Sequence, residues 1–432
     1  MLIAATILAI LIANTPAISS YYYWLWEQPV VLQIGDFNLF SHKGHQMNAM
    51  QFINDALMAV FFFSIGLEIK REVLVGELSS LRQCMLSVLG AVGGMIVPVL
   101  IFMWQARGSN YMGGAAIPMA TDIAFSLGVL SLLGTRVPLS LKIFLTTLAV
   151  VDDIGGIIVI AVFYTQSIDY HLLLYAAGLL GLLIAGSYMK VRMKMYYILI
   201  GIAVWFLFLN SGIHSTIAGV LVAFCIPAAP VFNPRKYIKA IRESISHFPV
   251  EKDYSDDPKL HYILSKQQIN QLKHIEEASN RVISPLQDLE DTLRPFVDYI
   301  VVPLFAFANA GICFEGMALS DVTGGVSIAI ILGLVVGKFV GIFLFSALAI
   351  LLRLAPMPAG STWKMLAATS VLGGIGFTVS LFIANLSFGS MGSEGMDLLN
   401  HAKLGILVGS VIAGLLGYLC LSAVLPEEKA TE

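Results

Sequence analysis

Long apolar stretches separated by short polar ones run through most of this chain. A helix needs about 20 mainly apolar residues to cross the roughly 30 Å hydrocarbon core of a bilayer. The apolar stretches lie at residues 1–18, 51–67, 84–104, 112–131, 143–164, 171–189, 196–210, 212–227, 296–313, 324–351, 365–388 and 403–424. This pattern predicts an all-α polytopic membrane protein with about twelve transmembrane helices.

Two segments outside these stretches have a different pattern. In residues 29–39, the positions Val31, Gln33, Phe37 and Leu39 flank the two-residue turn Gly35-Asp36, which predicts a short β-hairpin outside the membrane. Residues 228–285 are polar and charged, and we interpret them as a solvated linker. Helical spacing of four positions within that linker also allows an amphipathic surface helix. These positions are Leu272, Ile275, Ser279 and Val282.

The placement of basic residues predicts the orientation in the membrane. Only 12% of the residues are charged, against about 25% in soluble domains, and 57% are hydrophobic. Short cytoplasmic loops are enriched in Lys and Arg. With the N-terminus inside, the cytoplasmic loops hold Lys70, Arg71, Arg136, Lys190, Arg192, Lys194, Arg353 and Lys364. The opposite side holds only Lys43, Arg107 and Lys403. We therefore expect both termini to be cytoplasmic.

These expectations divide the chain into four parts. They are spans one to eight over 1–227 with an outer hairpin near 29–39, a cytoplasmic loop over 228–285, spans nine to twelve over 286–424, and a cytoplasmic tail over 425–432. Four cysteines lie singly in apolar segments, so no zinc site, iron–sulfur cluster or disulfide framework is predicted.

Asp152 and Asp153 lie near the centre of the apolar stretch 143–164. An ionised carboxylate near the bilayer midplane is costly, so acids at that depth indicate a functional site. Burial and a like-charged neighbour both favour the protonated form. Such a carboxylate can therefore exchange a proton for a cation. Adjacent residues of a helix project about 100° apart, so we expect the two acids to differ in role.

Two other spans carry features that break a helix at mid-membrane depth. Pro118 removes a helix hydrogen bond just before Thr121 and Asp122, and the run at 373–376 is rich in glycine. Each break lies in the second of three consecutive spans, the pattern of an inverted-repeat transporter. Broken helices expose partial charges at their ends. Asp122 is the expected counter-charge for the positive ends and Lys338 for the negative ends, and a purely stabilising role for both remains open.

Five runs of residues resemble the NhaA-type sodium/proton antiporters of bacteria. They are GLEIKRE at 66–72, ATDIAF at 120–125, LAVVDDIG at 148–155, PLFAFANAG at 303–311 and GGIGFT at 373–378. The resemblance covers almost the whole chain. It implies a pH-regulated, electrogenic antiporter of the bacterial cytoplasmic (inner) membrane, with inverted repeats and two broken helices crossing at the midplane. Such a protein exports sodium or lithium, imports more than one proton per ion, and needs no cofactor.

The resemblance also implies roles for individual residues. Asp153 would be the chief ligand of the transported sodium, with Asp152 beside it and Thr121 and Asp122 close by. Lys338 would pair with Asp152 and compensate the helix ends.

For the pH response and for assembly, the resemblance is less complete. The residues matching the family's pH-responsive cluster are Glu68, Arg71, Glu72 and Glu290. Histidines expected just after Glu290 are replaced by Asp291 and Arg294, so the pH of activation is not implied. His214 matches a family position, and we interpret it as structural. The outer hairpin implies a homodimer.

Three alternative functions are compatible with buried acids in a membrane. An intramembrane aspartyl protease would carry Tyr-Asp and Gly-x-Gly-Asp signatures, whereas here the acids follow Thr121 and Val151. A sodium-coupled symporter would need a polar cluster for an organic substrate, and none is evident. A passive channel is disfavoured because a buried Asp-Asp-Lys group would trap ions. We therefore predict a secondary transporter of sodium and protons, neither an enzyme nor a nucleic-acid-binding protein.

Overall fold

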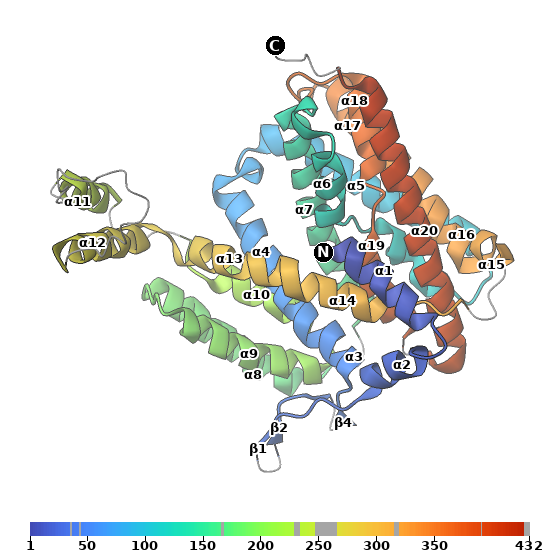
Figure 1. The fold of residues 1–432 in the computed structure, drawn as a ribbon, viewed down its shortest axis with the longest axis horizontal. Coiled ribbons are helices and arrows are strands. Elements are labelled where there is room, and N and C mark those ends of the chain that lie inside the picture. Colours follow the sequence, from blue (N-terminus) through green and yellow to red (C-terminus); the bar gives the residue numbers. More distant parts are fainter. Residues whose placement is uncertain are drawn as a thin grey trace, which may run out of the picture.

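The computed structural model describes residues 1–34, 37–42, 45–165, 168–228, 234–246, 266–314, 319–389 and 391–426. This part of the chain forms a helical bundle with two small hairpins at one end (Figure 1). Across it, eight helical segments are long and apolar enough to cross a membrane, and one bent pair of helices adds a ninth candidate. Two shorter apolar helices are Leu2–Ala13 and Thr216–Cys225.

All twelve predicted apolar stretches contain helix, which confirms the all-α polytopic fold. In the first half of the chain the helices are α1 (Leu2–Ala13), α2 (Ser19–Glu27), α3 (Ala49–Phe52), η1 (Ile53–Leu57), α4 (Met58–Val75), η2 (Glu77–Ser79), α5 (Leu81–Gln105), η3 (Met112–Met119), α6 (Ile123–Ser131), η4 (Gly134–Arg136), α7 (Leu139–Phe163), α8 (Tyr170–Tyr188), α9 (Lys194–Ser211) and α10 (Thr216–Cys225). In the second half they are α11 (Pro234–Ser246), α12 (Lys266–Val282), α13 (Pro285–Phe296), η5 (Val297–Val301), α14 (Val302–Asn309), α15 (Leu319–Thr323), α16 (Gly325–Leu332), η6 (Gly333–Gly337), α17 (Lys338–Leu351), α18 (Trp363–Leu372), α19 (Phe377–Phe388) and α20 (Gly392–Val424).

The paired strands of the predicted hairpin are present, and a second pair follows them; the predicted turn residues Gly35 and Asp36 lie outside the described residues. Strands β1 (Gln33–Ile34) and β2 (Phe37–Asn38) pair in antiparallel fashion, with Ile34 opposite Phe37. Strands β3 (Ser41–His42) and β4 (His45–Gln46) form the second pair. We call this end of the bundle the hairpin face, and the opposite end, where α10 ends and α13 begins, the loop face.

The prediction of a solvated linker over 228–285 is wrong for much of its length, whereas the alternative of a surface helix is confirmed for α12. Two helices, α11 and α12, form there and lie side by side outside the main bundle in Figure 1. The apolar positions of α12 at Leu272 and Ile275 recur at helical spacing among charges, which is the pattern of a surface helix.

The two predicted breaks occur and meet one another. Between η3 and α6 the chain is extended at Ala120 and Asp122. Between α18 and α19 the axis bends by 45° over four residues. The backbone N–H of Asp122 donates to the carbonyl of Ile375 at 2.7 Å, so the two unwound segments contact each other directly. Non-helical backbone at membrane depth survives only where such contacts satisfy it.

Helix α5, from the first half of the chain, packs closely against α17, from the second half. A Cβ atom on Gly341 would lie 2.1 Å from the carbonyl oxygen of Gly93, and one on Gly93 would lie 2.3 Å from that of Gly341. Only glycine at both positions allows the backbones to approach so closely. Lys338 begins α17 one turn before Gly341, so this contact also sets the position of its side chain.

Candidate functional site

Asp122 lies where the broken helices meet, and it caps the N-termini of both. Its Oδ1 accepts a hydrogen bond from the backbone N–H of Phe125, in the first turn of α6, at 3.0 Å. Its Oδ2 accepts from the backbone N–H and the hydroxyl of Thr378, in the first turn of α19, at 3.1 and 2.6 Å. Each helix N-terminus carries about half a positive charge. One buried carboxylate therefore compensates two helix ends.

Hydroxyl groups satisfy the carbonyls that the breaks expose. Thr121 donates to the carbonyl of Gly373, just after the C-terminal end of α18, at 2.9 Å. Ser126 donates to the carbonyl of Leu372 at 3.1 Å. These buried contacts fix the relative position of the two unwound segments.

Lys338 is fully buried. It directly follows the π-helical turn η6, and the wider turn changes the direction in which the side chains after it project from the helix. Its ammonium donates to a carboxylate oxygen of Asp152 and, at 2.8 Å, to the hydroxyl of Thr121. The ammonium was expected to compensate the negative helix ends. It reaches the end of α18 only through Thr121, which bonds to the carbonyl of Gly373.

Asp152 and Asp153 are both buried on α7 and have different surroundings. Asp152 has one oxygen on Lys338, and its Oδ1 is buried with no hydrogen-bond partner. Asp153 accepts no hydrogen bond from the described residues and lies within electrostatic range of Asp152, Asp122 and Glu68. An unpartnered carboxylate oxygen is a site that a proton or a hard cation can occupy.

The charges at this crossing do not cancel. Asp122, Asp152 and Asp153 face a single buried base, Lys338. Ionised groups in a low-dielectric interior are costly unless they are paired. The excess acid can be neutralised by a proton or by a bound cation. The described residues hold no cluster of three or more His, Cys, Asp or Glu side chains suited to a resident metal ion.

At the loop face, the structure brings together the four residues of the expected pH-responsive cluster. The Nε of Arg71 lies 3.0 Å from both carboxylate oxygens of Glu290, and its Nη1 lies 2.8 Å from Glu72. Glu68 lies within electrostatic range of these groups and of Arg294. Glu290 is buried, with 8% of its side chain exposed. This cluster ties the end of α4 to α13.

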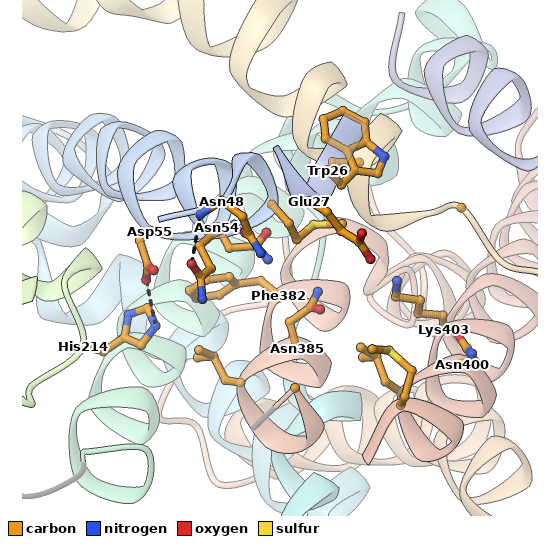
Figure 2. Close-up of a pocket in the computed structure, with 18 of the residues that line it drawn as sticks. Trp26, Glu27, Asn48, Asn54, Asp55, His214, Phe382, Asn385, Asn400 and Lys403 are labelled. Carbon is orange, nitrogen blue, oxygen red and sulfur yellow. Dashed lines mark hydrogen bonds and ion pairs between the residues drawn. The ribbon is translucent and has the colours of Figure 1, made fainter. Parts of the chain in front are cut away.

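At the hairpin face, a pocket of about 820 Å³ opens between several helices (Figure 2). Asp55 lines it, lying 3.3 Å from the hydroxyl of Ser215 and 3.8 Å from Nε2 of His214. His214 also bonds to Thr216 at 2.9 Å, which fits the structural role expected for it. Lys403 lines the opposite side, inside α20.

The sequence analysis did not single out two of these pocket residues. Asp55 is an acid within the apolar stretch 51–67, the same signal that identified Asp152, and it could have been found in that way. Lys403 was expected at the outer end of the last span, as the first residue of 403–424. The helix instead begins at Gly392, so Lys403 lies well inside it.

Comparisons with known proteins agree on one family. Residues 1–421 match the model of the family described as Na+/H+ antiporter 1. The chain is 53% identical over 432 residues to the Na+/H+ antiporter NhaA of Phocaeicola vulgatus, covering 100% of this chain and 94% of that protein. It is 54% identical over 430 residues to that of Bacteroides fragilis, covering 99% and 96%. The corresponding protein of Escherichia coli is 42% identical over 423 residues, covering 97% and 93%.

Proposed function

The chain belongs to the Na+/H+ antiporter 1 family, and from this premise we propose that it exports sodium or lithium in exchange for protons. It is a multi-pass membrane protein and a secondary transporter rather than an enzyme. We place it in the bacterial cytoplasmic membrane with both termini inside. The hairpin face is then outer and the loop face cytoplasmic.

The observation that carries this proposal is the uncompensated acid at the crossing of the broken helices. Deprotonated Asp153 and Asp152 offer hard oxygen ligands, which suit sodium and lithium. Protonation removes both the charge and the ligand. One site can therefore hold either sodium or protons, and this competition couples the two fluxes.

The transport cycle follows from that competition. Sodium binds to the aspartate pair from the cytoplasm and leaves outside, where protons displace it. The protonated site then turns back to the cytoplasm and releases its protons. The hydrogen bonds around Asp122 and Thr121 join the two broken helices, so these helices move together. Alternating access then arises as they rock against the rest of the bundle.

Electrogenic exchange follows if two protons enter for each sodium ion that leaves. Asp153 supplies one proton site, and the second is Asp152 or Lys338, whose ion pair must open for the proton to move. One net charge then crosses in each cycle. A membrane potential of 100 mV contributes about 2.3 kcal/mol to that step.

We expect Lys338→Ala and Asp122→Ala to weaken sodium-driven proton movement by about tenfold to a hundredfold without abolishing it. Lys338→Ala leaves Asp152 without its partner, and Asp122→Ala leaves two helix N-termini uncompensated. Neither change removes the oxygens of Asp153. The check is the initial rate in inverted vesicles, normalised to the amount of protein in the membrane. Complete loss in both variants at normal protein levels would contradict this division of roles.

We propose that the cluster of Glu68, Arg71, Glu72 and Glu290 sets the pH response. Glu290→Gln removes a negative charge beside the other acids and so favours their charged forms. The pH profile of transport should then move to lower pH by about half a unit or more. Arg71→Gln removes the positive partner, and the profile should move to higher pH.

A matched control for these shifts is Lys194→Gln, which removes a partly exposed ion pair with Asp288 on the same face, with 2.8 Å between the Lys194 Nζ and the Asp288 Oδ1. Exposed pairs of this kind contribute little. Its pH profile should stay within a tenth or two of a unit of the unmodified protein. Equal shifts in all three variants, or shifts of one sign in both cluster variants, would refute the proposed role of the cluster.

We further propose a homodimer that associates through β1 to β4. Short strands at an exposed end can pair with the same strands of a second copy. Replacing residues 31–46 with a short Gly-Ser linker should convert the dimer to a monomer when the mass of the purified protein is measured in mild detergent. A dimer that survives this change would place the interface elsewhere.

The exchange itself is tested in inverted membrane vesicles from a host that lacks sodium/proton antiporters. Sodium added to respiring vesicles enters the lumen through the cytoplasmic face of the protein, and protons leave. The acidic lumen should become more alkaline, with a response that depends on pH between about 6.5 and 9. No response to sodium or lithium at any pH in this range would favour a symporter.

A further inference from the structure

The pocket at the hairpin face is separate from the aspartate site. None of Asp122, Asp152 or Asp153 lines it. Along α19, Thr378 contacts Asp122, Phe382 lies one turn further towards the hairpin face, and Asn385 lies in the next turn. Sodium that leaves the aspartates towards this face must therefore pass Phe382 and Asn385 before it enters the pocket.

The floor of the pocket is closed in this structure. Phe382 is fully buried, with ring centroids 5.7 Å from Phe62 and 5.3 Å from His214. Asn385 donates to Asn309 at 2.7 Å, so an amide hydrogen bond joins α19 to α14 beside the ring. The pocket is consequently an outer chamber, which a departing ion reaches only after this contact opens.

Opposite charges lie on the two sides of the chamber. In Figure 2, Asp55 and His214 lie on one side and Lys403 on the other, with Asn385 between them. Asp55 accepts a hydrogen bond from Ser215 and keeps 23% of its side chain exposed. Glu27 also lines the pocket and is exposed.

Lys403 is unusual among these residues because it is mostly buried and has no charged partner. It is 7% exposed, and across the described parts of the chain it has neither an ion pair nor a hydrogen-bond partner. Its ammonium is not among the fully buried polar atoms, so the accessible end of the side chain faces the chamber. Long basic side chains bury their stems and keep the charged head in water. The charge of Lys403 is therefore held in the chamber through which the cation leaves (Figure 2).

We infer that Lys403 is a further residue of the transport reaction, which repels sodium within the outer chamber and opposes the attraction of Asp55. This inference rests on the proposed exchange of sodium for protons. Asp55 draws the ion away from the closed floor, and Lys403 prevents it from remaining there. Lys403 therefore weakens the binding of external sodium and favours export, without touching the cytoplasmic approach to Asp153.

The test compares the two faces of the membrane. Right-side-out vesicles with an acidic interior take up sodium through the outer face, and inverted vesicles take it up through the cytoplasmic face. Lys403→Met should lower the sodium concentration that gives half-maximal rate at the outer face by about fivefold, since a like charge at this range is removed. At the cytoplasmic face that concentration should change by less than about twofold. Lys403→Arg keeps the charge and should behave as the unmodified protein does.

Asp55→Asn provides a second variant with the opposite sign. It should raise the half-maximal sodium concentration at the outer face about fivefold and leave the cytoplasmic face nearly unchanged. Equal changes at both faces, or no change in either variant while the unmodified protein exchanges sodium for protons, would overturn this inference alone. An unmodified protein that does not exchange the two ions would overturn the proposed function and this inference with it.

Discussion

Asp153→Asn abolishes sodium-driven proton movement, with an expected loss of a hundredfold or more in initial rate. Asparagine has nearly the shape of aspartate, so α7 should pack as before. The amide, however, neither carries a negative charge nor takes up and releases a proton. Both halves of the competition are therefore lost at once. Asp153 makes no hydrogen bond that asparagine would break within the described residues, so the loss should not arise from unfolding.

The matched control for this change is Asp397→Asn, which removes an exposed carboxylate from α20 at the hairpin face. It should retain full exchange in inverted vesicles. Asp152→Asn should lose nearly as much activity as Asp153→Asn, because it leaves the ammonium of Lys338 buried without a counter-charge. If Asp153→Asn retained exchange at a normal protein level, Asp153 would not be a ligand of the transported ions.

Gly341→Leu prevents folding of the bundle. A Cβ at this position would lie 2.1 Å from the carbonyl oxygen of Gly93, far inside the van der Waals distance. The obstacle is backbone on the facing helix, so no side-chain rotation relieves it. Helices α5 and α17 would have to separate, which would displace Lys338 from Asp152. We expect a loss of more than about 4 kcal/mol in the free energy of unfolding.

The measurement is the elution profile of the detergent-extracted protein, detected through a fused fluorescent protein. Gly341→Leu should give aggregate or no extractable protein. The matched control is Gly178→Leu on α8, where an added Cβ meets nothing within 4 Å and the position is exposed. It should elute as a single peak. A single peak and normal transport for Gly341→Leu would show that the α5–α17 contact is not required.

The helical fold could be predicted because its signal is local. Each apolar stretch long enough for a bilayer must form helix, since no other open backbone structure is satisfied in lipid. The breaks at Pro118 and Gly373 were visible for the same local reason. Helix α11 was not predicted, and α12 was predicted only as the alternative to a linker, because a polar sequence with a few apolar positions fits both a surface helix and a linker.

The contacts within the site could be predicted only in part. Buried charge pointed to Asp152, Asp153, Asp122 and Lys338 because each lies inside an apolar run. That Asp122 caps two helices at once, and that Thr121 links Lys338 to the end of α18, depends on how segments more than 200 residues apart meet. No periodicity in the sequence records such a meeting. Lys403 was misplaced because the polar start of α20 resembles a loop.

The measurement that bears most directly on competition at the aspartate pair is proton release on sodium binding. Purified protein in weakly buffered detergent solution is mixed with sodium chloride, and the pH is followed with an indicator dye. The unmodified protein should release between one and two protons for each sodium ion bound near neutral pH, potassium chloride should release none, and Asp153→Asn should not respond to sodium. Sodium binding without proton release would contradict a shared site for the two ions.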